Sequence, residues 1–216
     1  MKKTTGLFYL ITGLVASIIL VIIYIAYLLL TTSQVPESDV AFDPASGITV
    51  IDPAVSMPDF TLTDQHSQPI HLRDFSGKPI LLTFGFTHCP DVCPLTLQEM
   101  REIHTDLGEF GDALHYVFIS VDGERDTPEA LAEYFVTMRI DDFAVGLTGS
   151  PETVRELGED YRLFFAHEQP DEQGNYAVEH TAGLFLLDSE NHWIRRYAFG
   201  ANRALISRDL LDLVQK

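Results

Sequence analysis

The chain has 216 residues and a formal net charge of −18. Two of its 14 basic residues, Lys2 and Lys3, precede an uncharged run, so residues 31–216 carry 12 basic (14 − 2) and 32 acidic side chains, a net charge of −20. Such a surface repels phosphate backbones, which argues against nucleic-acid binding and favours a metal cation or a basic partner protein. Two cysteines cannot build a disulfide-rich scaffold, so the fold must rest on a hydrophobic core.

The N-terminal segment predicts a membrane anchor. Residues 7–30 read LFYLITGLVASIILVIIYIAYLLL, and a helix with a rise of about 1.5 Å per residue spans a hydrocarbon core of about 30 Å over this length. Lys2 and Lys3 place residues 1–6 in the cytoplasm and the rest of the chain outside. The alternative, a cleaved signal peptide, has an apolar region of only about 7–15 residues. We therefore expect a single-pass protein of the cell (inner) membrane with an extracytoplasmic, periplasmic domain.

Residues 31–56 contain scattered prolines and acidic residues without a sustained hydrophobic period. This composition predicts a tether with one short strand at residues 48–51. The folded domain is expected over residues 57–216.

Within this domain, apolar periodicity predicts alternating strands and helices. Strands are expected at residues 60–62, 70–72, 80–86, 114–121, 144–147, 183–187 and 192–197, and helices at residues 95–110, 126–138, 150–157 and 204–214. Residues 161–165 are expected to be extended and residues 171–175 to form a turn. This order predicts an α/β sandwich around a mixed central sheet.

Cys89 and Cys93 directly follow the buried strand expected at residues 80–86, and open α/β folds build their sites at that end of a strand. A spacing of four (93 − 89) brings both sulfurs to one side of a helix or tight loop. A helix N-terminus favours the thiolate, which attacks disulfides and binds metal, whereas the charge of Asp91 opposes ionisation. Two thiolates select soft or borderline ions such as Cu(I) or Zn(II). The alternative is a structural disulfide, but its loop is so short that it would stabilise the fold little.

A third ligand would have to come from one of eight histidines. His88 adjoins Cys89, but neighbouring side chains at the end of a strand point to opposite faces. His180 stands just before the strand at residues 183–187. If that strand lies beside residues 80–86, topology brings His180 next to the cysteines. The alternative is a loop histidine that bonds only to backbone.

The run from Gly85 to Pro94, GFTHCPDVCP, resembles the signature of the Sco/SenC family of copper-binding assembly proteins. Residues 58–62, 120–128 and 176–181 resemble, in order, the family's domain opening, its second strand with the following loop, and its histidine loop. The resemblance implies a thioredoxin-like fold after one N-terminal transmembrane helix. It also implies one copper ion, Cu(I) or Cu(II), bound by Cys89, Cys93 and His180.

The function implied by the resemblance is that of a copper chaperone for the Cu-A centre of cytochrome c oxidase. The Cu-A-bearing subunit would be its partner, together with another copper chaperone or a thiol reductant. The alternative is a thiol–disulfide oxidoreductase in which Cys89 and Cys93 form a redox pair that keeps the target's cysteines reduced. A third class, a peroxiredoxin-like peroxidase, predicts a lone reactive cysteine near residues such as Thr87 and Arg162, and the paired cysteines argue against it.

The chain departs from the family pattern at two positions. Gly123 stands where proline is common, which is expected to loosen the loop without removing a ligand. Glu179 stands where aspartate is usual, which moves a charge beside His180 outwards by one methylene.

Overall fold

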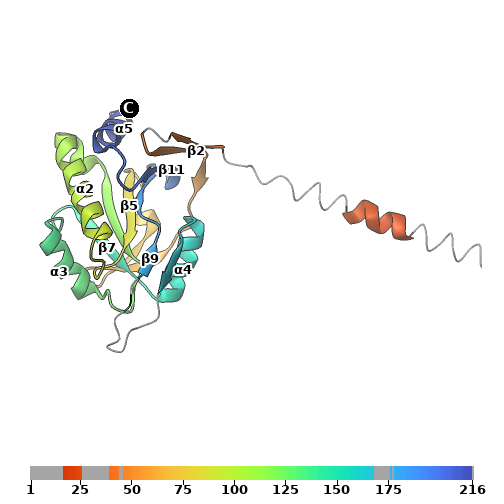
Figure 1. The fold of residues 1–216 in the computed structure, drawn as a ribbon, viewed down its shortest axis with the longest axis horizontal. Coiled ribbons are helices and arrows are strands. Elements are labelled where there is room, and N and C mark those ends of the chain that lie inside the picture. The colour runs from red at the N-terminus through yellow and green to blue at the C-terminus, as the bar shows by residue number, and fades with distance from the viewer. Residues whose placement is uncertain (1–16, 26–38, 44–45, 168–175, 177, 216) are drawn as a thin grey trace, which may run out of the picture. The chain divides into compact units, whose positions relative to one another are not determined.

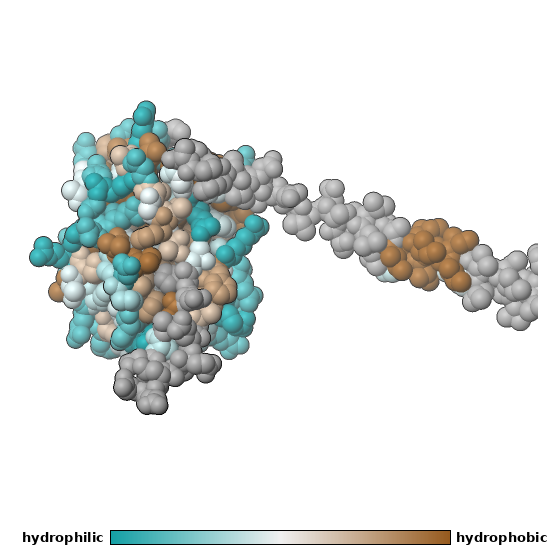
Figure 2. All heavy atoms as spheres, in the orientation of Figure 1, coloured by the Kyte–Doolittle hydropathy of each residue, from teal (hydrophilic) through white to brown (hydrophobic). Residues whose placement is uncertain are grey.

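The computed structural model describes residues 17–25, 39–43, 46–167, 176 and 178–215, and it divides into two units, Met1–Ser38 and Asp39–Lys216. In the first unit residues 17–25 form a helix whose apolar side chains are exposed (Figure 2). Within the described part of the chain, no helix combines the length and the apolarity needed to span a bilayer. The rest of the anchor expected over residues 7–30 lies outside the described residues, so the anchor stays a prediction.

The second unit is built on a nine-stranded sheet in the order β1-β2-β11-β10-β5-β6-β7-β3-β4 (Figure 1). Its strands are β1 (Asp39–Asp43), β2 (Ile48–Ser56), β3 (Thr61–Asp64), β4 (Pro69–His71), β5 (Ile80–Gly85), β6 (His115–Ser120), β7 (Ala144–Thr148), β10 (Gly183–Leu187) and β11 (His192–Ala198). The pairs β5–β6 and β6–β7 are parallel and the others are antiparallel. The predicted mixed sheet is therefore confirmed. Two short strands, β8 (Phe165–His167) and β9 (Val178–His180), form a separate pair.

Helices cover both faces of the sheet (Figure 1). They are α2 (Val92–Leu107), α3 (Pro128–Met138), α4 (Pro151–Asp160) and α5 (Arg203–Val214), with two 3-10 turns at Leu72–Phe75 and Gly108–Ala113. Leu81 of β5 packs with α2, α3 and α5, whereas Leu82 and Phe84 pack with α4 on the other face. Burial on both faces explains why β5 is a continuous apolar run, and it gives the following loop a rigid base.

Residues 31–56 were expected to be a tether with one short strand at residues 48–51. That strand is confirmed as the start of β2, but β2 is longer than expected, and β1 precedes it in the sheet. Pro53 in the middle of β2 made this stretch resemble a linker, because proline cannot donate to a ladder. It is accommodated because the register between β2 and β11 shifts next to Trp193, where the ladder is irregular.

Residues 161–165, expected to be extended, mostly form the turn that ends α4. Arg162 has a φ of 51°, and the amide of Leu163 donates to the carbonyl of Gly158 at 2.7 Å. Tyr161 and Leu163 are buried, so their apolar character reflects packing beneath the helix and not strand pairing. The turn expected at residues 171–175 lies outside the described residues.

Candidate functional site

Both cysteines lie at the junction between β5 and α2. The amide of Cys89 donates to the carbonyl of Phe86 at 3.2 Å, which closes a tight turn. Helix α2 begins at Val92, three residues earlier than expected, so Cys93 lies in its first turn. The amide of Cys93 donates to Sγ of Cys89 at 3.4 Å. The sulfur of Cys89 thus takes the place of a capping acceptor at the positive end of the helix.

The two thiols differ in burial: Cys89 is half-buried, whereas Cys93 is 2% exposed. Burial raises the pKa of the Cys93 thiol, and a hydrogen bond with the backbone of Phe86 opposes this rise. The neighbouring Cys89 and, more weakly, the charge of Asp126 add to the rise. A Cβ on Gly85 would lie 2.9 Å from Sγ of Cys93, so glycine here makes room for that sulfur. Cys93 therefore keeps its proton at neutral pH until a metal or a redox reaction removes it.

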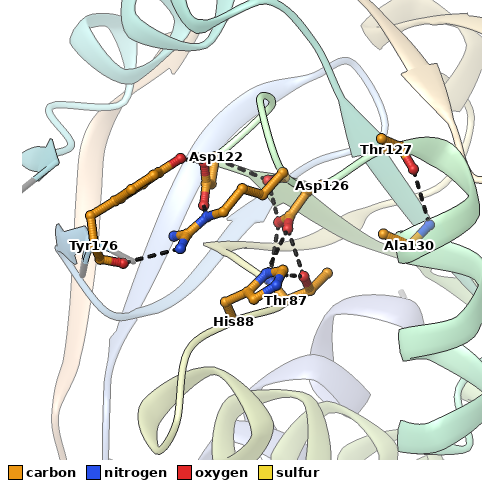
Figure 3. Close-up of polar contacts among 9 residues, drawn as sticks. Thr87, His88, Asp122, Asp126, Thr127, Ala130 and Tyr176 are labelled. Carbon is orange, nitrogen blue, oxygen red and sulfur yellow. Dashed lines mark hydrogen bonds and ion pairs between the residues drawn. The ribbon is translucent and has the colours of Figure 1, made fainter. Parts of the chain in front are cut away.

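Asp126 ties the cysteine loop to the loop that follows β6. Its carboxylate accepts hydrogen bonds from the Thr87 amide (2.9 Å), the Thr87 hydroxyl (2.6 Å) and the Ser120 hydroxyl (2.6 Å). The Asp126 side chain is fully buried, and Figure 3 shows it facing Thr87 and His88. The sequence pattern predicts a helix that starts at Asp126, but the helix is capped by Thr127, which accepts a hydrogen bond from the Ala130 amide.

Asp122 connects the same loop to the segment that leads into β9. Its carboxylate accepts hydrogen bonds from the Tyr176 hydroxyl (2.6 Å) and from Nε of Arg125 (2.5 Å). Asp122, Arg125, Asp126 and Tyr176 were not among the predicted site residues. Their signal was nevertheless present, because three of them directly follow a buried strand at the edge of the sheet where the cysteines lie.

Tyr134 of α3 packs beside Phe118, with 6.3 Å between the ring centroids. Burial raises the pKa of Tyr134, and the charges of Cys93, Cys89 and Asp126 add to this rise. Its hydroxyl is buried, and no acceptor for it lies among the described side chains.

The prediction for His180 required that the strand at residues 183–187 lie beside residues 80–86. It does, because β10 pairs with β5 through Phe185↔Leu82 and its neighbours. The Thr83 hydroxyl of β5 donates to the Gly183 carbonyl of β10 at 2.9 Å. The backbone of His180 ends β9 opposite Phe165, so His180 belongs to a strand and not to a loop. The side chains of His180 and Glu179 lie outside the described part of the molecule.

The described residues therefore provide two of the three predicted ligands. The structure brings Cys89 and Cys93 together, and no group of three or more His, Cys, Asp or Glu side chains suited to a metal occurs in the part of the chain that is described. The two sulfur donors fit a soft cation. They fit equally well a dithiol with one accessible and one buried sulfur.

Gly123, noted as a departure from the family pattern, is closely packed. A Cβ at this position would lie 1.8 Å from the carbonyl oxygen of Gly149. The space that a proline ring needs is thus filled by backbone, which accounts for glycine at this position; the loosening of the loop stays a prediction.

Comparison with known proteins gives one consistent result. The sequence model of the family described as SCO1/SenC matches residues 49–215. The mitochondrial SCO2 homologue of Danio rerio is 38% identical over 149 residues, 67% of this chain and 52% of that protein. The human mitochondrial SCO1 homologue is 35% identical over 149 residues, 67% of this chain and 47% of that protein. The chain thus spans about half the length of these relatives.

Solved structures agree with this result. Bradyrhizobium japonicum ScoI, solved with copper bound, has a TM-score of 0.67 at 33% identity, and the match covers 74% of this chain and 99% of that one. Yeast Sco1, also solved with copper bound, has a TM-score of 0.67 at 26% identity, covering 75% of this chain and 90% of that one. The thioredoxin-like α/β fold and the resemblance drawn from the motifs are confirmed.

Proposed function

The chain belongs to the SCO1/SenC family, and on that premise we propose that it is a membrane-anchored copper chaperone for the Cu-A centre of cytochrome c oxidase. The observation that carries the proposal is the pair of thiols at the N-terminus of α2, where the Cys93 amide donates to the Cys89 sulfur. Related proteins with this fold have been solved with copper bound.

The proposed ligands are Cys89 and Cys93 as thiolates and His180 as a neutral imidazole. Two sulfur donors favour Cu(I), and an imidazole allows Cu(II) as well. A site with three protein ligands leaves the ion approachable, so incoming cysteines of a target can replace these ligands one at a time. Binding must displace the proton that burial retains on Cys93, so copper affinity rises with pH.

The proposed partner is the Cu-A-bearing subunit of the oxidase. A second proposed partner is either another copper chaperone or a thiol reductant. The net charge of −20 on residues 31–216, 12 basic against 32 acidic side chains, favours a basic partner surface. Residues 7–30 would span the cell membrane, with residues 1–6 in the cytoplasm and the copper-binding domain, which includes β1 and β2 ahead of the residues 57–216 first expected, outside. The exposed apolar side chains of the helix at residues 17–25 support this placement.

One observation favours a second function, a thiol–disulfide oxidoreductase. Cys89 is half-buried and reachable, whereas Cys93 is buried behind it. An accessible attacking sulfur with a protected resolving sulfur is the arrangement that dithiol exchange requires. Oxidation of the pair would abolish copper binding, so the two functions are compatible.

The first test is a copper titration of the full chain in detergent with both thiols reduced, repeated on His180→Ala. We expect one equivalent to bind tightly and the variant to bind at least about tenfold more weakly, because one of three ligands is lost. His192→Ala is the matched control, since His192 pairs with Asp188 in the turn between β10 and β11.

Two outcomes would overturn the chaperone assignment. One is the absence of copper binding by the reduced chain. The other is equal affinity in His180→Ala and the parent chain. In either case the reduction potential of Cys89 and Cys93 would test the oxidoreductase instead.

A further inference from the structure

The loop between β6 and α3, residues 121–127, contacts both halves of the site. We propose that Arg125 and Tyr176 are positioning residues: through Asp122 they hold the segment that leads to His180 against the cysteine loop before any metal binds. This inference rests on the proposed three-ligand site and explains how its ligands, 91 positions apart at their extremes (180 − 89), are kept close together.

On one side the loop holds the residues that precede Cys89. Thr87 lies two residues before Cys89, and Asp126 accepts hydrogen bonds from both its amide (2.9 Å) and its hydroxyl (2.6 Å). The guanidinium of Arg125 lies 5.9 Å from the ring centroid of Phe86, the residue before Thr87. The start of the cysteine loop therefore cannot move without breaking its bonds to the loop of residues 121–127.

On the other side the loop holds Tyr176, four residues before His180 (Figure 3). The Tyr176 hydroxyl donates to Oδ1 of Asp122 at 2.6 Å, and Nη1 of Arg125 donates to the Tyr176 carbonyl at 3.1 Å. The guanidinium carbon of Arg125 lies 3.6 Å from the centroid of the Tyr176 ring. Tyr176 is thus held by its hydroxyl, its ring and its backbone.

The two sides are mechanically joined. The Asp126 amide donates to the Asp122 carbonyl at 2.9 Å, and the Ser120 hydroxyl bonds to both the Asp126 carboxylate and the Asp122 amide. The carboxylates of Asp122 and Asp126 are fully buried. Hydrogen bonds to desolvated carboxylates are stronger and more costly to break than those in water.

These contacts lower the cost of closing a metal site. A ligand brought from a distant segment must be ordered when the metal binds, and that ordering reduces affinity unless it has already occurred. The bonds around Arg125 and Tyr176 join protein groups only and include no metal ligand, so they can order Tyr176, four residues before His180, in advance. Removing them should weaken copper binding only when the His180 ligand is present.

The test is a double-mutant cycle on the full chain in detergent with thiols reduced. Tyr176→Phe removes only the hydroxyl that Asp122 binds, and Arg125→Lys keeps the charge but loses the planar stacking. We expect each to weaken copper binding about tenfold, the loss typical of one hydrogen bond to a charged group. In a His180→Ala background neither change should weaken it further.

The matched control is Tyr197→Phe. Its buried hydroxyl donates to Asp209 of α5 at 2.7 Å, so it loses the same kind of bond away from the thiols. It should lose comparable stability but leave copper affinity unchanged. Hydrogen exchange of the metal-free chain gives a second readout: the Thr181 amide, which donates to the Phe164 carbonyl at 2.8 Å, should exchange faster in Tyr176→Phe and not in Tyr197→Phe.

The possible failures are distinguishable. If His180→Ala binds copper as the parent chain does, the proposed function fails, and amide exchange alone decides whether Tyr176 orders the segment. If His180→Ala weakens binding but Tyr176→Phe behaves like Tyr197→Phe, the positioning role is overturned. An equal effect of Tyr176→Phe with and without His180 would also overturn it, since the residue would then act on the fold as a whole.

Discussion

The carboxylates at the two ends of the central sheet differ in burial and in how far along the chain their hydrogen-bond partners lie. At the end where the cysteines lie, the carboxylates of Asp122 and Asp126 are fully buried and accept bonds from three separate segments. At the other end, the turn between β10 and β11 is organised by Asp188, which is 29% exposed and accepts the amides of Glu190 and His192.

This difference separates two tasks. The Asp188 turn uses local bonds, within four residues, to reverse the chain at little desolvation cost. The Asp122–Asp126 loop buries two carboxylates, which is costly unless every bond is made, and it joins segments 39 and 54 residues apart. Such an arrangement fixes the relative positions of loops, which is the requirement of a site and not of a turn.

The substitution with the largest expected effect tests this contrast directly. Asp126→Asn keeps the shape but places an NH2 donor among three donors, and we expect it to lower the free energy of unfolding by about 3 kcal/mol. Asp188→Asn at the other end should cost about 1 kcal/mol. Denaturant unfolding followed by the fluorescence of Trp193, the only tryptophan, measures both. Equal losses would show that the ends do not differ.

Gly85 and Gly146 allow an effect on the thiols to be separated from a loss of stability in the core. A Cβ at Gly85 would lie 2.7 Å from the Phe118 ring, and one at Gly146 would lie 2.8 Å from the Phe135 ring. Each change to alanine should cost about 2 kcal/mol through overpacking. Only Gly85→Ala also approaches Sγ of Cys93, so only that variant should change thiol alkylation rates, measured by mass spectrometry. A change in Gly146→Ala as well would mean that thiol reactivity follows stability alone.

The pH dependence of stability reports the burial of Cys93. Because its folded pKa is raised, the unfolded chain loses the thiol proton above about pH 8.5 while the folded chain keeps it. This contribution to stability is complete below that pH and is lost as pH rises, by roughly 1 kcal/mol per pH unit. Between about pH 8 and 10, the free energy of unfolding should fall more steeply with pH for the reduced chain than for Cys93→Ala. Parallel curves would contradict the assigned burial.

The smallest effect is expected at His88. Its side chain is 56% exposed, and Nδ1 lies 3.8 Å from the Asp126 carboxylate. Exposed pairs of this kind contribute little, so His88→Ala should change stability by less than about 0.5 kcal/mol. Copper affinity should change less than about twofold. A tenfold loss of affinity would make His88 a ligand and displace His180 from that role.

The sequence allowed much of the fold and the cysteine pair to be predicted, because β5 is a continuous apolar run and both cysteines follow it locally. The bonds that join the loops could not be predicted in the same way. Asp126 precedes Thr-Pro-Glu, a pattern that indicates a helix start, and its true partner Thr87 is 39 residues away. Tyr176 and Asp122 are 54 residues apart, and no spacing rule relates them. The strand expected at residues 48–51 is only the first part of β2. Pro53 concealed the rest, because a register irregularity that accommodates proline has no signature in one strand alone.

The hydrogen bond from the Cys93 amide to the Cys89 sulfur has a spectroscopic consequence. The acceptor of that amide changes whenever Cys89 is alkylated, oxidised or bound to a metal, while the amide itself stays in the backbone of α2. Its proton resonance therefore serves as an internal indicator of the chemical state of the neighbouring sulfur, with no probe attached to that sulfur. Where the states exchange slowly, this one amide gives a separate peak for each, so peak intensities in a nitrogen–proton spectrum would count reduced, oxidised and metal-loaded molecules in the same sample.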